Sequence, residues 1–206
     1  MPAKRLICDA CLRPQSACIC HWVAPVAHLT EVLILQHPLE QHHAKNSARL
    51  LHLSLPASRL LVGEVFDAIA LHAAMRVPKY TVLLYPSTAH AGHQTPAPLN
   101  AQRPQDASRL RLVVLDATWR KSRKMLHQSP LLQGLPRLSL TDVPASSYHI
   151  RKAHKPGQLS TLEATCAALA QLEGNTQQYQ PLLTAFDGFV AQQSAFRQST
   201  PKQPTT

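Results

Sequence analysis

Residues 110–125 read LRLVVLDATWRKSRKM and predict a strand, a turn and the start of a basic helix. The apolar run 112–115 ends at Asp116, and Thr118 and Trp119 follow before the basic residues begin. Ligands of open α/β sheets bind at the carboxyl ends of the strands, so a carboxylate, a hydroxyl and an indole here are candidate site residues. Two other interpretations stay open: Asp116 caps the following helix, and Trp119 belongs to the core.

Strand and helix patterns alternate on both sides of this stretch. The other predicted strands are 31–36, 59–62, 80–85 and 135–140, and the other predicted helices are 44–53, 64–75, 160–172 and 181–196. This alternation predicts an α/β fold with a mostly parallel sheet and flanking helices. A chain of 206 residues can bury one core, so one domain with a small appendage accounts for its length.

The composition favours a polyanionic partner. The chain has 21 Lys and Arg residues against 11 Asp and Glu, a formal net charge of +10 at pH 7 with His neutral. A charge of this size attracts phosphates and favours nucleic acid over a merely basic surface. Lys45 and Arg49 lie one turn apart on a predicted helix, where they contact phosphate or, as is commoner for such pairs, face solvent.

The chain contains no signal for a membrane. No apolar run approaches the roughly 18 residues that a membrane span requires, and the first residues lack the apolar region of a signal peptide. The sequence therefore predicts a cytoplasmic protein with no membrane partner. That compartment disfavours disulfides and leaves the five cysteines for metal binding or chemistry.

Four cysteines, Cys8, Cys11, Cys18 and Cys20, lie within thirteen residues in the pattern C-x2-C-x6-C-x-C. Two tight turns can present four thiolates tetrahedrally, so we predict a small N-terminal zinc knuckle with four cysteine ligands. The second pair is more closely spaced than zinc ligands usually are, which leaves His21 as a substitute for one thiol. Two disulfides and an iron–sulfur cluster are the alternatives.

Two further polar segments follow a predicted strand or open a predicted helix. The sequence Pro86-Ser87-Thr88 ends the strand 80–85, although a plain Pro-Ser turn also explains it. Residues 159–164, LSTLEA, open a helix that Ser160 or Thr161 can cap, with Glu163 in the first turn and backbone N–H groups free for an anion. Together with Asp116, these segments predict one shared crevice.

A basic loop precedes that helix. Residues 141–156 carry Tyr148, Arg151 and Lys152 with little apolar periodicity. Loops of this length inside a domain are commonly functional, so the loop is a candidate binding segment.

Five separated motifs resemble the DTW-domain family. They are C-x2-C-x-R-P before C-x-C at 8–20, YPS at 85–87, D-A-T-W at 116–119, Y-x2-R-K at 148–152 and L-S-T-x-E-A at 159–164. The resemblance covers nearly the whole chain from Cys8 onward. It implies a SPOUT-like fold with a knotted cofactor site, in which residues 1–30 form the zinc knuckle and linker, 31–197 the catalytic domain and 198–206 a polar tail.

The resemblance also implies a reaction. Members of the family resemble tRNA-uridine aminocarboxypropyltransferases that use S-adenosyl-L-methionine. By that similarity, the chain transfers the 3-amino-3-carboxypropyl group to N3 of a uridine in the tRNA variable loop and releases 5′-methylthioadenosine. A SPOUT-like RNA methyltransferase and a non-catalytic, zinc-knuckle tRNA-binding protein are the alternatives.

The candidate residues divide by chemistry. Uridine N3 is a poor nucleophile while protonated, so we expect Asp116 to accept that proton or orient the uracil, and Trp119 to pack on a base or the cofactor. The residues expected to bind the cofactor are Pro86, Ser87, Thr118, Leu159, Ser160, Thr161 and Glu163. The residues expected to bind RNA are Arg120, Lys121, Arg123, Lys124, Tyr148, Arg151 and Lys152.

Overall fold

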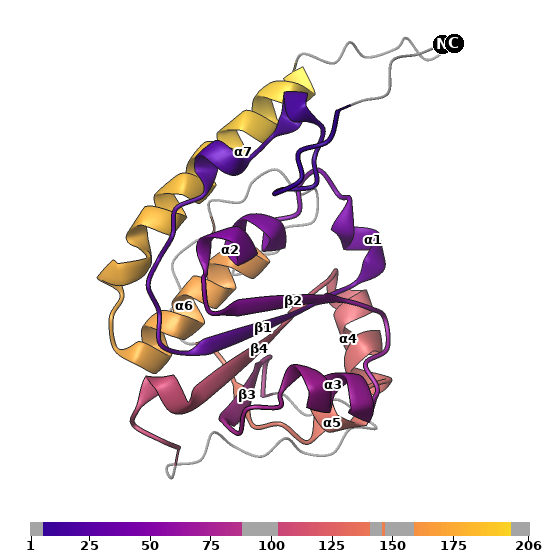
Figure 1. Ribbon diagram of the computed structural model, residues 1–206, viewed down its shortest axis with the longest axis vertical. Coiled ribbons are helices and arrows are strands. Elements are labelled where there is room, and N and C mark those ends of the chain that lie inside the picture. Colours follow the sequence, from indigo (N-terminus) through magenta and orange to yellow (C-terminus); the bar gives the residue numbers. More distant parts are fainter. Residues whose placement is uncertain (1–5, 88–102, 141–145, 147–158, 199–206) are drawn as a thin grey trace.

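The computed structural model describes residues 6–87, 103–140, 146 and 159–198, and it has a five-stranded parallel sheet at its centre (Figure 1). The strand order is β2-β1-β4-β3-β5, and all four strand pairs are parallel. The strands are β1 Glu31–Gln36, β2 Ser58–Val62, β3 Tyr80–Leu84, β4 Leu110–Asp116 and β5 Arg137–Leu138. The predicted α/β fold with a mostly parallel sheet is confirmed.

Helices cover both faces of the sheet. The α-helices are α1 Pro38–Gln41, α2 Ala48–Ser54, α3 Ala68–Ala74, α4 Trp119–His127, α5 Pro130–Gln133, α6 Thr161–Glu173 and α7 Gln180–Gln198. Short 3-10 helices are η1 Gln15–Ala17, η2 Cys20–Trp22, η3 Ala107–Arg109 and η4 Gln177–Tyr179. Helices α2, α6 and α7 pack on one face, and α3, α4 and α5 on the other (Figure 1). No helix among the described residues is long and apolar enough to cross a membrane.

The central strand β4 is buried on both faces. Leu112 and Val114 belong to the apolar layer beneath α2, α6 and α7, whereas Val113 belongs to the layer beneath α3, α4 and α5. This two-sided burial explains why the strand reads as a continuous apolar run, because both of its faces are covered by helices.

Two helices begin later than their apolar periodicity predicts. Helix α2 begins at Ala48 and not at residue 44, because the Asn46 side chain accepts the N–H of Arg49 at 3.2 Å. Helix α3 begins at Ala68 and not at residue 64, because Asp67 caps it by accepting the N–H of Ala70. Side-chain acceptors of this kind compete with the helical backbone and so set where a helix starts.

The predicted start of α6 is confirmed. The Ser160 hydroxyl accepts the backbone N–H of Glu163 at 3.1 Å, and the Glu163 carboxylate accepts the N–H of Ser160 at 2.7 Å. This reciprocal capping box holds the first turn of α6 at the carboxyl edge of the sheet. Strand β5 is shorter than the predicted 135–140 and pairs only with residues of β3.

The direction of the chain connections reverses between the neighbouring strands β1 and β4. These neighbours leave the sheet in opposite directions: β1 leads to β2 through α2 on one face, and β4 leads to β5 through α4 and α5 on the other. Such a topological switch point is where open α/β sheets bind ligands. In the parallel register the last residues of the two strands, Gln36 and Asp116, lie side by side.

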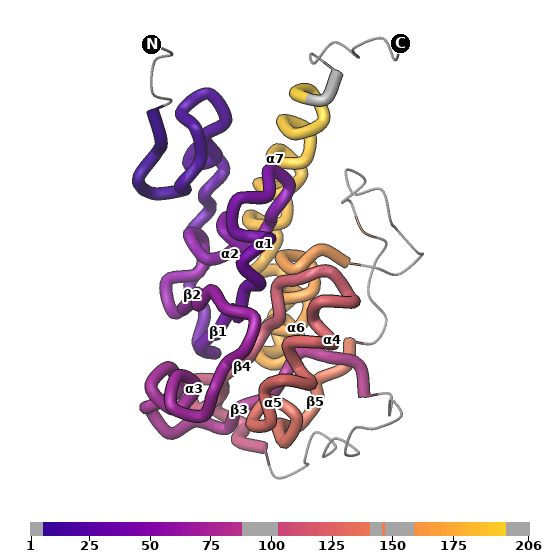
Figure 2. Tube along the Cα trace, turned by 90° about the vertical axis from the view of Figure 1, so that its right-hand side faces the viewer, coloured from indigo at the N-terminus to yellow at the C-terminus, as the bar shows by residue number. Residues whose placement is uncertain are grey.

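The N-terminal segment docks on helix α7. Figure 2 shows the segment at the same end of the molecule as the second half of α7. The Trp22 indole N–H donates to the Gln192 side chain at 2.8 Å, and the Gln192 amide donates to the carbonyl of Cys18 at 3.3 Å. A Cβ at Gly188 would lie 2.1 Å from the Trp22 ring, so only glycine allows this close approach.

Candidate active site and metal centre

Asp116 lies at the carboxyl end of β4 and is 3% exposed. Its Oδ2 accepts hydrogen bonds from Asn46 Nδ2 at 2.6 Å and from Gln36 Nε2 at 2.9 Å. Its Oδ1 accepts one from the Thr161 hydroxyl at 2.6 Å. Strand β1, the loop before α2 and the first residue of α6 therefore converge on one carboxylate, which three donors hold in a single orientation.

The interpretation of Asp116 as a helix cap is wrong. The residue at the N-cap of α4 is Thr118, and no side-chain hydrogen bond caps that helix. The backbone carbonyl of Asp116 accepts the N–H of His37 at 3.0 Å, which extends the contact between β1 and β4. The main chain and the side chain of Asp116 thus both form hydrogen bonds to residues at the end of β1.

The interpretation of Trp119 as a core residue is also wrong. Its side chain is 48% exposed, and its ring stacks on Tyr85 with centroids 5.2 Å apart and planes 11° apart. The Arg137 guanidinium lies 5.3 Å from the Tyr85 centroid. Burial raises the pKa of Tyr85 above its usual value. Trp119 is therefore a half-exposed ring with one face stacked on the buried Tyr85, which in turn contacts the Arg137 guanidinium.

Four of the predicted cofactor residues lie at the start of α6, beside Asp116. Thr161 contacts Asp116 directly, and Leu159 and Ser160 precede it at the start of α6. Ser160 and Glu163 bind each other in the capping box, and Glu163 also accepts the Ser146 hydroxyl at 2.8 and 2.9 Å. These two side chains fix the helix start, and a cofactor contact from either stays a prediction.

The remaining predicted cofactor residues lie at strand ends. Pro86 and Ser87 follow β3 and are exposed, and the Ser87 N–H donates to the Ser139 hydroxyl at 2.8 Å. Thr118 is exposed between β4 and α4. The carboxyl edge of the sheet thus carries the predicted polar groups after β3 and β4, and the structure adds Gln36 from β1.

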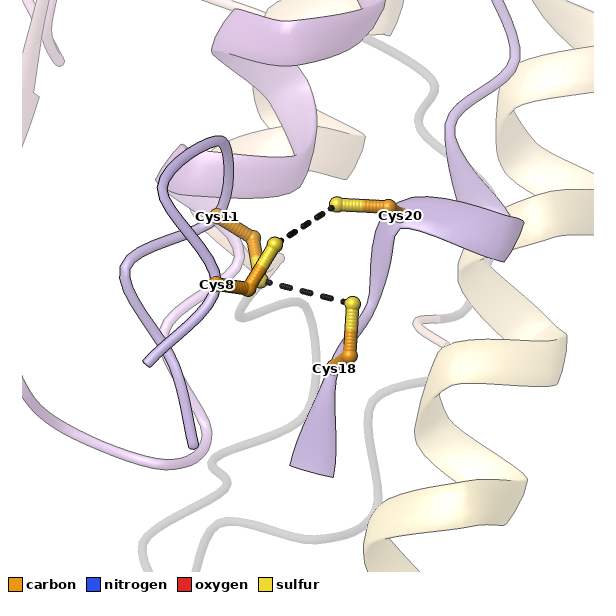
Figure 3. A group of neighbouring side chains, drawn as sticks. All are labelled: Cys8, Cys11, Cys18 and Cys20. Carbon is orange, nitrogen blue, oxygen red and sulfur yellow. Dashed lines mark hydrogen bonds between the residues drawn. The ribbon is translucent and has the colours of Figure 1, made fainter. Parts of the chain in front are cut away.

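The four N-terminal cysteines come together from two separate turns (Figure 3). Their Sγ atoms all lie within 4.8 Å of one another, with those of Cys8 and Cys20 3.5 Å apart and those of Cys11 and Cys18 3.8 Å apart. Zn–S bonds of about 2.3 Å in a tetrahedron separate the sulfurs by about 3.8 Å, so the cluster matches the size of a metal site. All four are free cysteines, so no disulfide joins any of them in this structure.

Backbone geometry prepares this cluster for a cation. Leu12 adopts a left-handed conformation, with φ of 59°, which turns the chain directly after the first two cysteines. The backbone N–H of Cys11 lowers the pKa of the Cys8 thiol to about 6. Burial raises the pKa of the Cys20 thiol to about 12, so the backbone favours the thiolate form that metals bind at Cys8 and not at Cys20.

The model of the DTW domain family matches residues 5–194 of this chain. The chain belongs to the DTW domain family. It is 32% identical over 189 residues to the Drosophila melanogaster protein named tRNA-uridine aminocarboxypropyltransferase 2, a match that covers 88% of this chain and 72% of that protein. The match to tRNA-uridine aminocarboxypropyltransferase A of Arabidopsis thaliana is 30% over 230 residues and covers 98% and 86%. No solved structure matches the chain.

The basic residues behind the family's D-A-T-W motif divide into two pairs. Lys121 binds Glu40 at 3.3 Å, and Lys124 binds Glu64 at 2.5 Å. Arg120 and Arg123 are exposed, and neither forms an ion pair with another described residue. Three further predicted RNA-binding residues lie outside the described residues: Tyr148, Arg151 and Lys152.

Sequence reasoning misses three residues of this DTW site. Gln36 ends a strand that reads as apolar, although a polar residue at the end of a buried strand is itself a signal. Asn46 falls inside a predicted helix, and its contact with Asp116 spans 70 residues. Arg137 falls on a predicted strand, and nothing near it in the sequence indicates that it lies over Tyr85.

Proposed function

We propose that this DTW-domain protein is a tRNA-uridine aminocarboxypropyltransferase. It moves the 3-amino-3-carboxypropyl group of S-adenosylmethionine to N3 of a variable-loop uridine and releases 5′-methylthioadenosine. The observation that carries the proposal is the buried, triply hydrogen-bonded Asp116 beside the half-exposed Trp119, at the switch point of a chain in this family.

Asp116 is the residue proposed to act on uridine N3, the acceptor of the transferred group. Attack by uridine N3 requires removal of its proton or stabilisation of the resulting anion. The three donors around Asp116 hold its carboxylate in place, and the Thr161 hydroxyl lies between that carboxylate and the start of α6. In this proposal Asp116 takes the proton or orients the uracil edge, and Thr161 couples it to the donor site.

The proposed site for S-adenosylmethionine, the donor of the transferred group, lies at the same edge of the sheet. S-adenosylmethionine supplies a sulfonium that activates the Cγ atom of its amino-acid arm. We assign the donor to a knotted, SPOUT-like cofactor site formed by residues after β3 and β4 and at the start of α6: Pro86, Ser87, Thr118, Leu159, Ser160 and Thr161. The buried Glu163 supports it by capping α6.

The tRNA contacts are assigned to α4 and its surroundings. Arg120 and Arg123 form no ion pair among the described residues, which suits their charges to phosphates. Trp119 offers an aromatic face on which an unstacked base can lie. Lys121 and Lys124 would first exchange their carboxylate partners for phosphate. These assignments favour tRNA as the partner in a cytoplasmic setting.

The metal assigned to the knuckle is Zn²⁺. Four thiolates complete a tetrahedral site with no open position, the arrangement of structural zinc. The binding free energy of such a metal is folding free energy for a small segment. The knuckle therefore has a structural role, and no step of the reaction passes through its metal.

Mass spectrometry of nucleosides tests the reaction. Unmodified tRNA incubated with the protein and S-adenosylmethionine should yield an aminocarboxypropyl-uridine and 5′-methylthioadenosine. A methylated nucleoside with S-adenosylhomocysteine would replace the proposal with a methyltransferase. Absence of both products, together with no cofactor binding by calorimetry, would favour the non-catalytic tRNA-binding protein.

A further inference from the structure

An arginine of the cysteine knuckle reaches the loop that carries Asn46. Arg13 lies between Cys11 and Cys18 in the sequence. Its guanidinium donates to the carbonyl of Ala44 at 2.6 Å and to the carbonyl of Asn46 at 3.1 Å. The two bonds fix the main chain at Asn46 and two residues before it.

Asn46 passes this constraint to the buried carboxylate. It is one of the most buried polar residues in the described part of the chain, with 2% of its surface exposed. Its Nδ2 donates to Asp116 Oδ2 at 2.6 Å, and its Oδ1 accepts from Gln36 Nε2 at 3.3 Å and from the Arg49 N–H at 3.2 Å. A shift of the Asn46 main chain therefore moves the donor that orients Asp116.

Arg13 is in turn tied to the cysteine cluster. Its own carbonyl accepts the N–H of Cys8 at 2.8 Å, and its guanidinium lies 5.2 Å from the ring centroid of Phe189 on α7. Closure of the four cysteines around a metal thus holds the main chain of Arg13, while α7 supports its side chain. Hydrogen bonds therefore connect the cluster to Asp116 through Arg13 and Asn46.

We propose that Arg13 and Asn46 are positioning residues for Asp116, and that the knuckle serves the active site by holding Arg13. This inference rests on the proposed function for its kinetic consequences. It assigns the knuckle a task beyond its own folding: to set the angle of a carboxylate on the far side of the loop before α2.

Arg49 provides a matched control. Its guanidinium reaches from α2 to the carbonyl of Ala10 in the knuckle, so it braces the same two parts of the chain. The side-chain hydrogen bonds of Arg49 go to Ala10, whereas one of those from Arg13 goes to the carbonyl of Asn46. Loss of either guanidinium weakens knuckle docking, but only loss of Arg13 releases the Asn46 carbonyl.

NMR of the Asn46 side-chain amide tests the inference without any assay of activity. The signal is assigned by its loss in Asn46→Ala. With zinc content confirmed in each variant, we expect its exchange with water to rise by roughly tenfold or more in Arg13→Met and to stay near wild type in Arg49→Met. Unchanged protection in Arg13→Met, or equal loss in both variants, would overturn the inference. This outcome is independent of the proposed reaction.

Turnover tests the consequence for catalysis. If aminocarboxypropyl transfer is observed in wild type, we expect kcat to fall roughly 10- to 100-fold in Arg13→Met, with little change in KM for tRNA. Arg13→Lys, which keeps a single donor nitrogen in place of the two that bind these carbonyls, should recover part of kcat, and Arg13→Met should cause no further loss of kcat in an Asn46→Ala background. Additive losses in the double variant, or a change confined to KM, would contradict action through Asn46.

Discussion

The cysteine knuckle and the carboxyl edge of the sheet lie on either side of the loop before α2, and they are stabilised by different means. Among residues 6–22 only Cys11 and Ile19 are buried, and Leu6, Ile7 and Leu12 are 77%, 50% and 44% exposed. Strand β4, in contrast, is buried at six of its seven residues. The sheet edge rests on apolar layers, whereas the knuckle has almost no core and depends on its thiolates and on docking contacts.

Hydrogen bonds, and not apolar packing, set the orientation of the carboxylate at the site. The apolar layers place the end of β4 but do not choose the rotation of the Asp116 carboxylate, because hydrophobic burial has no directional preference. That choice falls to hydrogen bonds from Asn46, Gln36 and Thr161. Arg13 of the knuckle holds one of these donors, Asn46. The knuckle, which has few buried residues of its own, thus contributes to the orientation of the Asp116 carboxylate.

Removal of one thiolate should give the largest effect on the knuckle. Structural zinc contributes about 10–16 kcal/mol in small metal-dependent folds, and Cys11→Ser removes a buried thiol from the proposed zinc cluster. We expect loss of bound metal and rapid proteolysis within residues 6–22, while the sheet stays protected. Metal content and limited proteolysis measure both.

Cys166→Ser is the control for that experiment. Cys166 is a buried thiol on α6 outside the cluster, and burial raises its pKa to about 12. Its replacement should leave metal content unchanged. Equal metal loss in both variants would show that general destabilisation, and not ligand loss, empties the knuckle.

Neutralisation of Asp116 should give the largest effect at the sheet edge. In Asp116→Asn the amide oxygen can still accept from Asn46 and Gln36, and the amide N–H can donate to the Thr161 hydroxyl. The substitution thus keeps the position and removes the charge. We expect single-turnover rates to fall roughly 10²- to 10⁴-fold, the usual contribution of a general base.

Comparison with Asp116→Ala separates the two roles of the carboxylate. A near wild-type rate in Asp116→Asn with loss in Asp116→Ala would assign Asp116 to orienting the uracil. Near wild-type turnover in both variants would remove Asp116 from the mechanism.

Patterns with a short range were predictable from the sequence. The bounds of β1 are those predicted for the strand around its apolar run 32–35, and the capping box of α6 follows from Ser160 and Glu163 three residues apart. The spacing of the four cysteines likewise predicts that they cluster. Each depends on periodicity or on groups close together in the chain, which a sequence displays directly.

Contacts between distant side chains were not predictable. Lys121 reads as an RNA-binding cation, yet its partner Glu40 lies 81 residues away. Arg13 binds backbone carbonyls 31 and 33 residues away, and a carbonyl carries no residue type that a sequence could reveal. The part of the site that orients Asp116 therefore became visible only once the elements were placed in space.

The substitution Gly188→Ala probes the packing between the N-terminal segment and α7, where the Trp22 ring lies against Gly188. Its Cβ would meet the Trp22 ring at 2.1 Å, and overpacking of this kind costs about 1–3 kcal/mol. We expect Gly188→Ala to lower the free energy of unfolding by that amount in urea titrations. In Gly134→Ala the nearest atom lies 3.8 Å away, so a similar loss there would contradict the steric explanation.

The two tryptophans of the chain divide between the two regions and should separate stability from binding. Trp22 packs against α7 and donates to Gln192, whereas Trp119 is 48% exposed and stacks on Tyr85. We expect Trp119→Ala to weaken tRNA binding about tenfold, the effect of losing one base stack, with a small change in stability. Trp22→Ala should lower the stability and change tRNA binding little, because the Trp22 ring fills the packed interface with α7. Equal binding losses in the two variants, measured by filter binding at one salt concentration, would mean that Trp119 supports the fold and does not meet the base.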